Sequence, residues 1–202
     1  MKPLTPASPH AIIMVGIPGA GKSTFGEKFA DTFKALFVGQ TTLQRKYTLS
    51  DTDAEELRDS ILNEFFKTQR TLVIDGGFNQ KEAREVMVRR LVKAGYRPLI
   101  IWVQTDTSEA RRRALKPFPS GSGLTDDEFT MMLEQFDTPG DKEKVVVISG
   151  RHTYESQLKI VLRQLAVADT SQPHVPMSPE EKERVTKINV TNRSRNRGTL
   201  LT

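Results

Sequence analysis

Short apolar runs alternate along the chain with longer stretches in which apolar residues recur every three to four positions. The apolar runs are nearly continuous, as expected for parallel strands that are covered on both faces. They lie at 11–15, 35–38, 71–75, 98–103 and 144–149. The stretches between them predict helices at 24–34, 52–66, 80–94, 108–115, 125–136 and 153–167. The pattern therefore predicts a three-layer α/β domain with a five-stranded parallel sheet over 11–167, without internal repeats.

Local signals mark several ends of these elements. Thr52–Glu55 and Thr125–Glu128 have capping-box spacing, which predicts that a helix begins at each. Gly95 follows an apolar periodic stretch and is expected to end that helix in the left-handed conformation. Residues 39–50 are polar and have no clear period, so no element is predicted there.

The two ends of the chain differ from the middle. Residues 1–10 contain three prolines and are expected to form an extended, loosely held arm. Residues 168–202 begin with a proline-containing polar linker and end in a stretch with three arginines and no acid. We expect a mobile basic tail there, which leaves open a contact with nucleic acid.

The amino-acid composition excludes several classes of chemistry and of partner. The 202 residues include no cysteine, which excludes disulfides, thiolate catalysis and cysteine metal sites. No apolar run approaches the roughly 20 residues needed to cross a bilayer, and the N-terminus lacks an apolar signal core. We therefore expect a cytoplasmic protein without a membrane partner. The net charge of +5 suits an anionic partner but does not by itself identify a nucleic-acid binder.

Residues 16–24, Gly-Ile-Pro-Gly-Ala-Gly-Lys-Ser-Thr, have the spacing of a phosphate-binding loop. Glycines let successive N–H groups turn toward a phosphate chain, and the following helix adds the positive end of its dipole. Lys22 supplies a cation for the β and γ phosphates, and Ser23 offers its hydroxyl to Mg²⁺. A Gly-rich turn is the alternative, but the strand before and the helix after favour nucleotide binding. The predicted cofactor-binding residues are Gly16, Pro18, Gly19, Ala20, Gly21, Lys22, Ser23 and Thr24.

Together with Asp75-Gly76 after a strand, the arginine-rich stretch 108–115 and the Gly/Ser loop 116–124, this loop resembles the P-loop kinases. That superfamily includes the polynucleotide 5′-hydroxyl kinases and the zeta-toxin-like kinases with an AAA-type ATP-binding domain, and more distantly the nucleoside monophosphate kinases. The resemblance covers 11–167. It implies a strand order of 2-3-1-4-5, a site at the carboxyl ends of the strands, and ATP with Mg²⁺ as cofactors.

The resemblance also implies roles for particular side chains. Asp75 would lie beside Mg²⁺, usually through water, although an Asp there could instead cap the following turn. Arginines at the edge of a closing loop would stabilise the charge of the transferring phosphoryl group. Arg112 and Arg113 are the candidates, with Arg111 as a further one. Successive helical residues point about 100° apart, so not all three can face the nucleotide.

Two departures from the family pattern concern the acceptor. The run after Asp75 has no arginine, which argues against a nucleoside monophosphate acceptor. The second strand is followed by Gly39-Gln40-Thr41-Thr42, whereas polynucleotide and zeta-toxin kinases place an acidic base there. Asp51 and Asp53 come later and are weaker candidates for the base. Their carboxylates are better explained as charge at a helix N-terminus.

The sequence therefore favours an ATP-dependent kinase acting on a hydroxyl acceptor. Its catalytic residues would be Lys22, Asp75, Arg112 and Arg113, and its metal ligands Ser23 and Asp75. A polynucleotide 5′ end, a nucleotide sugar and another small metabolite all remain open as acceptors. The second hypothesis is an ATP-binding regulatory or RNA-associated module with little chemistry of its own. A GTPase is disfavoured because no Asn-Lys-x-Asp motif is present.

Overall fold

The computed structural model describes residues 9–117, 123–140 and 143–170, with the side chains of 167–170 excepted. Its contacts divide the chain into two compact units, Met1–Ala166 and Val167–Thr202. The first unit contains all the strands described below. The greater part of the predicted N-terminal arm, the centre of the 116–124 loop and nearly all of the predicted tail lie outside the described residues.

The five strands form one parallel sheet in the order β2-β3-β1-β4-β5. They are β1 (His10–Val15), β2 (Leu36–Gly39), β3 (Leu72–Asp75), β4 (Arg97–Gln104) and β5 (Val145–Ser149). This confirms the predicted fold class and strand order. His10, expected in the N-terminal arm, is the first residue of β1 because it pairs with Arg97 of β4.

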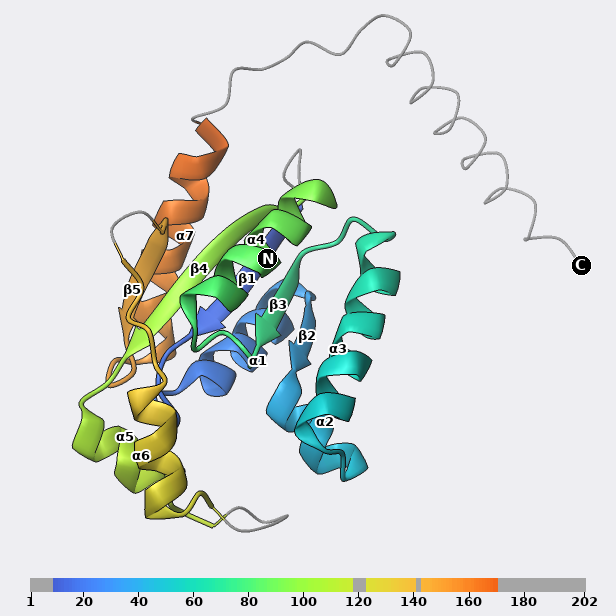
Figure 1. Cartoon of the computed structure of the whole chain (residues 1–202). Helices are drawn as coiled ribbons and strands as arrows, with labels where there is room; N and C mark the ends of the chain where they lie inside the picture. The colour runs from blue at the N-terminus through green and yellow to red at the C-terminus, as the bar shows by residue number, and fades with distance from the viewer. Residues whose placement is uncertain (1–8, 118–122, 141–142, 171–202) are drawn as a thin grey trace, which may run out of the picture. The chain divides into compact units, whose positions relative to one another are not determined.

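Seven helices are described. They are α1 (Lys22–Phe33), α2 (Gln40–Tyr47), α3 (Asp51–Phe66), α4 (Lys81–Lys93), α5 (Thr107–Ala114), α6 (Asp126–Glu134) and α7 (Tyr154–Thr170). In Figure 1 the strand arrows point toward the end of the sheet where α2 and the α5–α6 pair lie. Among the described residues, none of these helices is long and apolar enough to cross a membrane.

Alternate residues of β1 belong to the two cores on either face of the sheet. Ile12 and Met14 pack in one core with the three phenylalanines of α1 and with α7. Ala11, Ile13 and Val15 pack in the other core with residues of α3 and α4. All six residues of β1 are buried, which explains why the strand reads as a continuous apolar run. The strand before the phosphate-binding loop is therefore held from both sides.

The cap of α3 and the presence of α2 differ from the predictions. The side chain of Ser50, not of Thr52, caps α3 by accepting a hydrogen bond from the Asp53 N–H at 3.1 Å. The helix therefore begins at Asp51, one residue earlier than the predicted range. Helix α2 lies in the stretch for which no element was predicted. It has no buried residue and no side-chain cap, so neither an apolar stripe nor a capping residue marks it in the sequence.

The capping box at α6 is confirmed. The Thr125 hydroxyl accepts from the Glu128 N–H, and the Glu128 carboxylate accepts from the Thr125 N–H at 2.7 Å. Gly95 has a φ of 85°, in agreement with its predicted left-handed conformation after α4. These local signals fix the starts and ends of the elements that surround the sheet.

Candidate functional site

The loop between β1 and α1 reverses the chain at the carboxyl end of the central strand. Gly16, Gly19 and Gly21 all have positive φ angles, a region that side chains disfavour. Gly19 also lies against α5, where an added Cβ would come 2.9 Å from the carbonyl carbon of Ala110. The glycines are therefore needed both for the turn and for the close approach of α5.

Lys22 folds back over the loop. Its Nζ donates to the Gly16 carbonyl oxygen at 2.8 Å and to the Ile17 carbonyl oxygen at 3.1 Å. Burial lowers the pKa of Lys22, and the negative charge of Asp75 acts in the opposite direction. The ammonium group is thus held within the loop, where the phosphates of a nucleotide would lie.

Asp75 lies next to the loop because β3 pairs with β1, with Asp75 in register with Met14. The Ser23 hydroxyl donates to Asp75 Oδ2 at 2.5 Å. The other oxygen, Oδ1, is buried and has no hydrogen-bond partner among the described residues. Since buried polar atoms are normally satisfied, this oxygen is an acceptor that a bound cation could satisfy.

The Ser23–Asp75 pair fits Mg²⁺. This cation prefers oxygen ligands and is commonly held by one or two protein groups together with substrate phosphates. Within the described ranges, no cluster of three acidic or histidine side chains could hold a metal by itself. Burial, and then the negative charges of Asp75 and Asp31, raise the pKa of Glu27, so this carboxyl group lies within the electrostatic reach of Asp75.

The remaining predicted members of the loop have different surroundings. Ala20 is buried, and its carbonyl oxygen accepts from the Thr105 hydroxyl at 2.9 Å. Pro18 is half-buried, and Thr24 is exposed. Thr105 follows β4 and was not singled out in the sequence. A lone threonine after a strand gives no pattern that would have revealed its contact.

The three arginines of α5 have different hydrogen-bond partners and different exposures. Arg111 donates to Asp126 at 2.6 Å and to the Thr130 hydroxyl at 3.1 Å, which joins α5 to α6. Arg112 pairs with Glu109 at 2.7 Å and is 59% exposed. Hydrogen bonds from Arg112 and Arg113 lower the pKa of Glu109 to about 2.

Arg113 lies nearest to the phosphate-binding loop. It donates to Glu109 at 2.8 Å and to the Gly150 carbonyl oxygen at 3.1 Å. Gly150 packs against Ala20 so closely that an added Cβ would collide with its carbonyl oxygen. Arg113 is therefore linked to the loop through one residue, Gly150, which contacts both. Arg111 instead joins α5 to α6, and Arg112 lies on the surface.

The two acids considered as a base lie at the start of α3. Asp51 accepts a hydrogen bond from the Gln44 side chain. Asp53 accepts from the Ser50 hydroxyl at 2.7 Å. Both are exposed and each is bonded to a neighbouring side chain, as expected for charge at a helix N-terminus. Gly39 is in register with Asp75, and the next residue, Gln40, lies against Gly76 at the carboxyl edge.

Two buried arginines close to Gly76 were missed in the sequence. Arg58 and Arg84 are 4% and 0% exposed, and both donate to backbone carbonyls of residues 76–79. The helical spacing of these two arginines does indicate that they are buried. Arg58 stands four residues after Ala54, and Arg84 three before Met87, so each occupies the buried stripe of its helix.

A three-layer α/β fold with this loop, and with a carboxylate on the neighbouring strand, is the fold of the P-loop kinases. The family model of an AAA domain matches residues 12–139, and the chain belongs to that family. A comparison with curated protein sequences gives no match.

Solved structures share the fold at low sequence identity. A gluconokinase from Sinorhizobium meliloti 1021 is 18% identical with a TM-score of 0.58, over 80% of this chain and 94% of that one. A sugar kinase from Janibacter sp. HTCC2649 is 18% identical with a TM-score of 0.56, over 83% and 99%. A shikimate kinase from Aquifex aeolicus is 19% identical with a TM-score of 0.53, over 77% and 96%.

Proposed function

We propose that this chain is an ATP-dependent kinase that transfers the γ-phosphoryl group of ATP to a hydroxyl acceptor. One observation carries the proposal. Ser23 and Asp75 are hydrogen-bonded beside Lys22, and Asp75 keeps a buried oxygen that lacks a partner among the described residues. This combination provides a cation for phosphates and oxygens for Mg²⁺. The solved structures with this fold that were compared include kinases, which supports the assignment.

Each residue has a role in the transfer. The N–H groups of the loop and Lys22 bind the β and γ phosphates, while Ser23 and Asp75 hold the metal. Bound Mg²⁺ would neutralise the charge that develops on the phosphate oxygens. A bond forms between the acceptor oxygen and the γ phosphorus, and the bond to the β–γ bridging oxygen breaks, so ADP leaves. Arg113 would stabilise the charge of the transferring group after a small movement of α5.

The proton of the acceptor hydroxyl needs no carboxylate at the end of β2. Phosphoryl transfer has a loose transition state in most analyses, so the attacking oxygen gains little positive charge before the phosphoryl group is transferred. The proton can therefore leave late, to solvent or to a phosphate oxygen. The presence of Gln40 where related kinases carry an acid is compatible with this mechanism.

The test is ATP turnover with a panel of hydroxyl acceptors, in the wild type and in Lys22→Ala. We expect Lys22→Ala to lower turnover by about 100-fold or more, because it removes a charge that stabilises the transition state. Lys28→Ala is the matched control, since Lys28 lies on the same helix and contacts Tyr154 on the surface. Equal activity of the wild type and Lys22→Ala on every acceptor would show that this site does not perform the reaction.

The second candidate is an ATP-binding regulatory or RNA-associated module. Gln40 favours it, because an amide cannot act as a base. This candidate requires Mg·ATP binding without phosphoryl transfer to any acceptor in the panel. It also requires that deletion of 191–202 changes the slope of log K against log salt for single-stranded RNA. An unchanged slope would remove the tail from the hypothesis.

A further inference from the structure

The turn that follows Asp75 is held from two sides by buried arginines. Arg58 of α3 donates to the Gly76 carbonyl oxygen at 3.3 Å. Arg84 of α4 donates to the carbonyl oxygens of Phe78 at 3.2 Å and Asn79 at 3.1 Å. The turn lies at the carboxyl edge of the sheet, between the proposed metal carboxylate and the two helices. The charge that these arginines present there decides what kind of molecule can bind.

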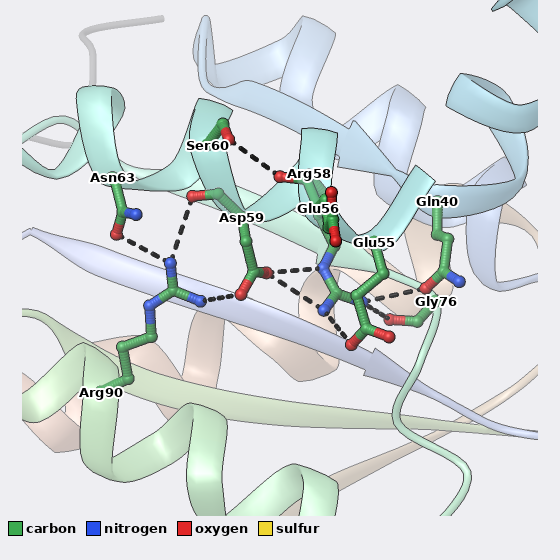
Figure 2. Close-up of polar contacts among 9 residues, drawn as sticks. All are labelled: Gln40, Glu55, Glu56, Arg58, Asp59, Ser60, Asn63, Gly76 and Arg90. Carbon is green, nitrogen blue, oxygen red and sulfur yellow. Dashed lines mark hydrogen bonds and ion pairs between the residues drawn. The ribbon is translucent and has the colours of Figure 1, made fainter. Parts of the chain in front are cut away.

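Every N–H group of Arg58 is already engaged (Figure 2). A guanidinium group has five donors, one on Nε and two on each Nη. Nε and Nη2 both donate to Asp59, and Nη2 also donates to Glu55 at 2.8 Å. Nη1 donates to Gln40 Oε1 at 2.9 Å and to Gly76. Arg58 therefore has no donor left for a bound anion unless one of these bonds breaks.

The charges of this network also cancel. Glu55 and Asp59 surround Arg58, and Arg90 of α4 pairs with the second oxygen of Asp59 at 2.7 Å (Figure 2). On the other side of the turn, Arg84 is paired with Glu143 at 2.7 Å. The cations of α2, Arg45 and Lys46, stand in its last turn, at the opposite end from Gln40. Both arginines at the turn are therefore neutralised by the protein's own carboxylates.

Arg58 also fixes the orientation of the Gln40 amide. Because a guanidinium group can only donate, the atom of Gln40 that faces it must be the oxygen. The nitrogen, Nε2, lies on the side away from Arg58 (Figure 2), so its N–H groups point away from the guanidinium group. Gln40 packs against the turn so tightly that a Cβ on Gly76 would lie 2.7 Å from the Gln40 Cβ.

We infer that Gln40 and Arg58 form the acceptor end of the site, and that this end takes an uncharged, hydroxyl-bearing acceptor. Gln40 Nε2 donates to an oxygen of the acceptor, and Arg58 is a positioning residue that holds the amide and the turn. A carboxylate or phosphate on the acceptor would lose water without gaining an unpaired cation from Arg58 or Arg84, and it would meet Glu55 and Asp59. This inference rests on the proposed kinase activity.

The first experiment compares matched acceptors. Wild-type protein is assayed with Mg·ATP on glucose against gluconate and on adenosine against adenosine monophosphate. We expect a kcat/KM at least about tenfold higher for the neutral member of a pair, the effect of one well-placed hydrogen bond or unpaired charge. Equal use of both members, preference for the anion, or failure of every neutral acceptor while Mg·ATP still binds would overturn the inference.

Substitutions then test the roles of Gln40 and Arg58 separately. Gln40→Leu should raise the acceptor KM by about tenfold while the Kd for Mg·ATP stays unchanged. Gln44→Leu is the matched control, because it changes the same residue type one turn later on α2, where the side chain bonds Asp51. An unchanged acceptor KM in Gln40→Leu would contradict the assignment. If the proposed kinase function itself were wrong, the result would be distinguishable, because Lys22→Ala would then leave turnover unaffected.

The positioning role of Arg58 is tested with conservative variants. Arg58→Lys keeps the charge but cannot make all five bonds, so the acceptor KM should rise with little change in the Kd for Mg·ATP. Glu55→Gln removes one of the charges that neutralise Arg58 and should shift the preference toward the anionic member of each pair. A fall in kcat alone in Arg58→Lys, or an unchanged preference in Glu55→Gln, would exclude this role.

Discussion

At the scale of single residues, the buried oxygen of Asp75 explains most of the chemistry proposed here. One oxygen accepts from Ser23, and the other has no partner among the described residues. An unsatisfied buried acceptor costs stability, so proteins keep one where a ligand supplies the missing interaction. This makes Asp75 the residue whose charge, rather than shape, should control metal dependence.

Asp75→Asn tests that role because it preserves shape and removes the charge. We expect the Mg²⁺ concentration for half-maximal turnover to rise by about 10–100-fold, as found when groups that orient a metal are replaced. Asp137→Asn is the control, since Asp137 is exposed and its carboxylate accepts from the Lys81 N–H at the start of α4. A Mg²⁺ titration that superimposes on the wild type would contradict the metal role.

The ion pair between the buried Arg84 and the half-buried Glu143 gives a prediction about pH. Hydrogen bonds from Arg84 lower the pKa of Glu143, while burial acts in the opposite direction. A carboxyl with a lowered pKa in the folded state stabilises the fold above its unfolded pKa of about 4.3. That contribution is lost as the pH falls through the lower, folded pKa.

Glu143→Gln should therefore destabilise the protein at pH 7 and reduce the loss of Tm between pH 5 and 3. The cost should be below the roughly 3–5 kcal/mol of a fully buried ion pair, because Arg84 would remain buried without its counter-charge but Glu143 itself is only half-buried. Thermal unfolding across this pH range measures both effects, and Glu134→Gln is the control on an exposed side chain. If the Tm of Glu143→Gln fell between pH 5 and 3 as much as that of the wild type, protonation of Glu143 would not contribute to acid unfolding.

At the scale of elements, the start of α3 separates what the sequence indicates from what the structure shows. The spacing Thr52–Glu55 predicted a cap at Thr52, but the Ser50 side chain makes the capping bond. Ser50→Ala should cost about 1 kcal/mol of stability, measured by urea unfolding. Thr52→Ala, two residues away on the exposed first turn, should change stability by less than about 0.5 kcal/mol. The reverse order of the two effects would restore the original assignment.

Most elements could be predicted because their signal is local or periodic. Strands buried on both faces appear as apolar runs, and the capping box of α6 can be recognised from the four residues Thr125–Glu128. Helix α2 could not be predicted, since it buries no side chain and its N-cap is Gly39. Arg58 and Arg84 could not be assigned to the site either. The backbone carbonyls that they bind lie outside their own helices, and only the folded chain brings the two arginines to the turn at Gly76.

At the scale of the whole molecule, the core is confined to one part of the chain. The buried hydrophobic residues among those described run from Ala11 to Leu165. A chain that ends after Thr170 keeps all of them. We expect its unfolding free energy to change by less than about 1 kcal/mol, a shift in Tm of roughly 2–4 °C. Affinity for Mg·ATP should also be unchanged. A much larger loss of Tm would show that residues 171–202 contribute to the stability of the core.

The order of the strands could be stated from the sequence only through the family resemblance. Apolar runs identify strands but do not say which strands are neighbours, because every parallel pair requires a crossover connection. The resemblance supplied the order, and the register then placed Asp75 beside the loop and Gln40 beside Gly76. The position of Asp75 beside the loop was thus predictable, whereas the position of Gln40 depends on contacts between α2, α3 and the turn at Gly76.

The central place of β1 has a consequence for synthesis on the ribosome. It is made before every other strand, yet Ala11 pairs only with Leu72 of β3 and with Pro98 of β4. Until those residues have left the exit tunnel, a fully apolar segment has no partner. Such long-range pairing is slow and leaves the nascent chain prone to aggregation. The nucleotide loop at the end of β1 would therefore be completed late, and a chain stalled before Arg97 would be a substrate for chaperones.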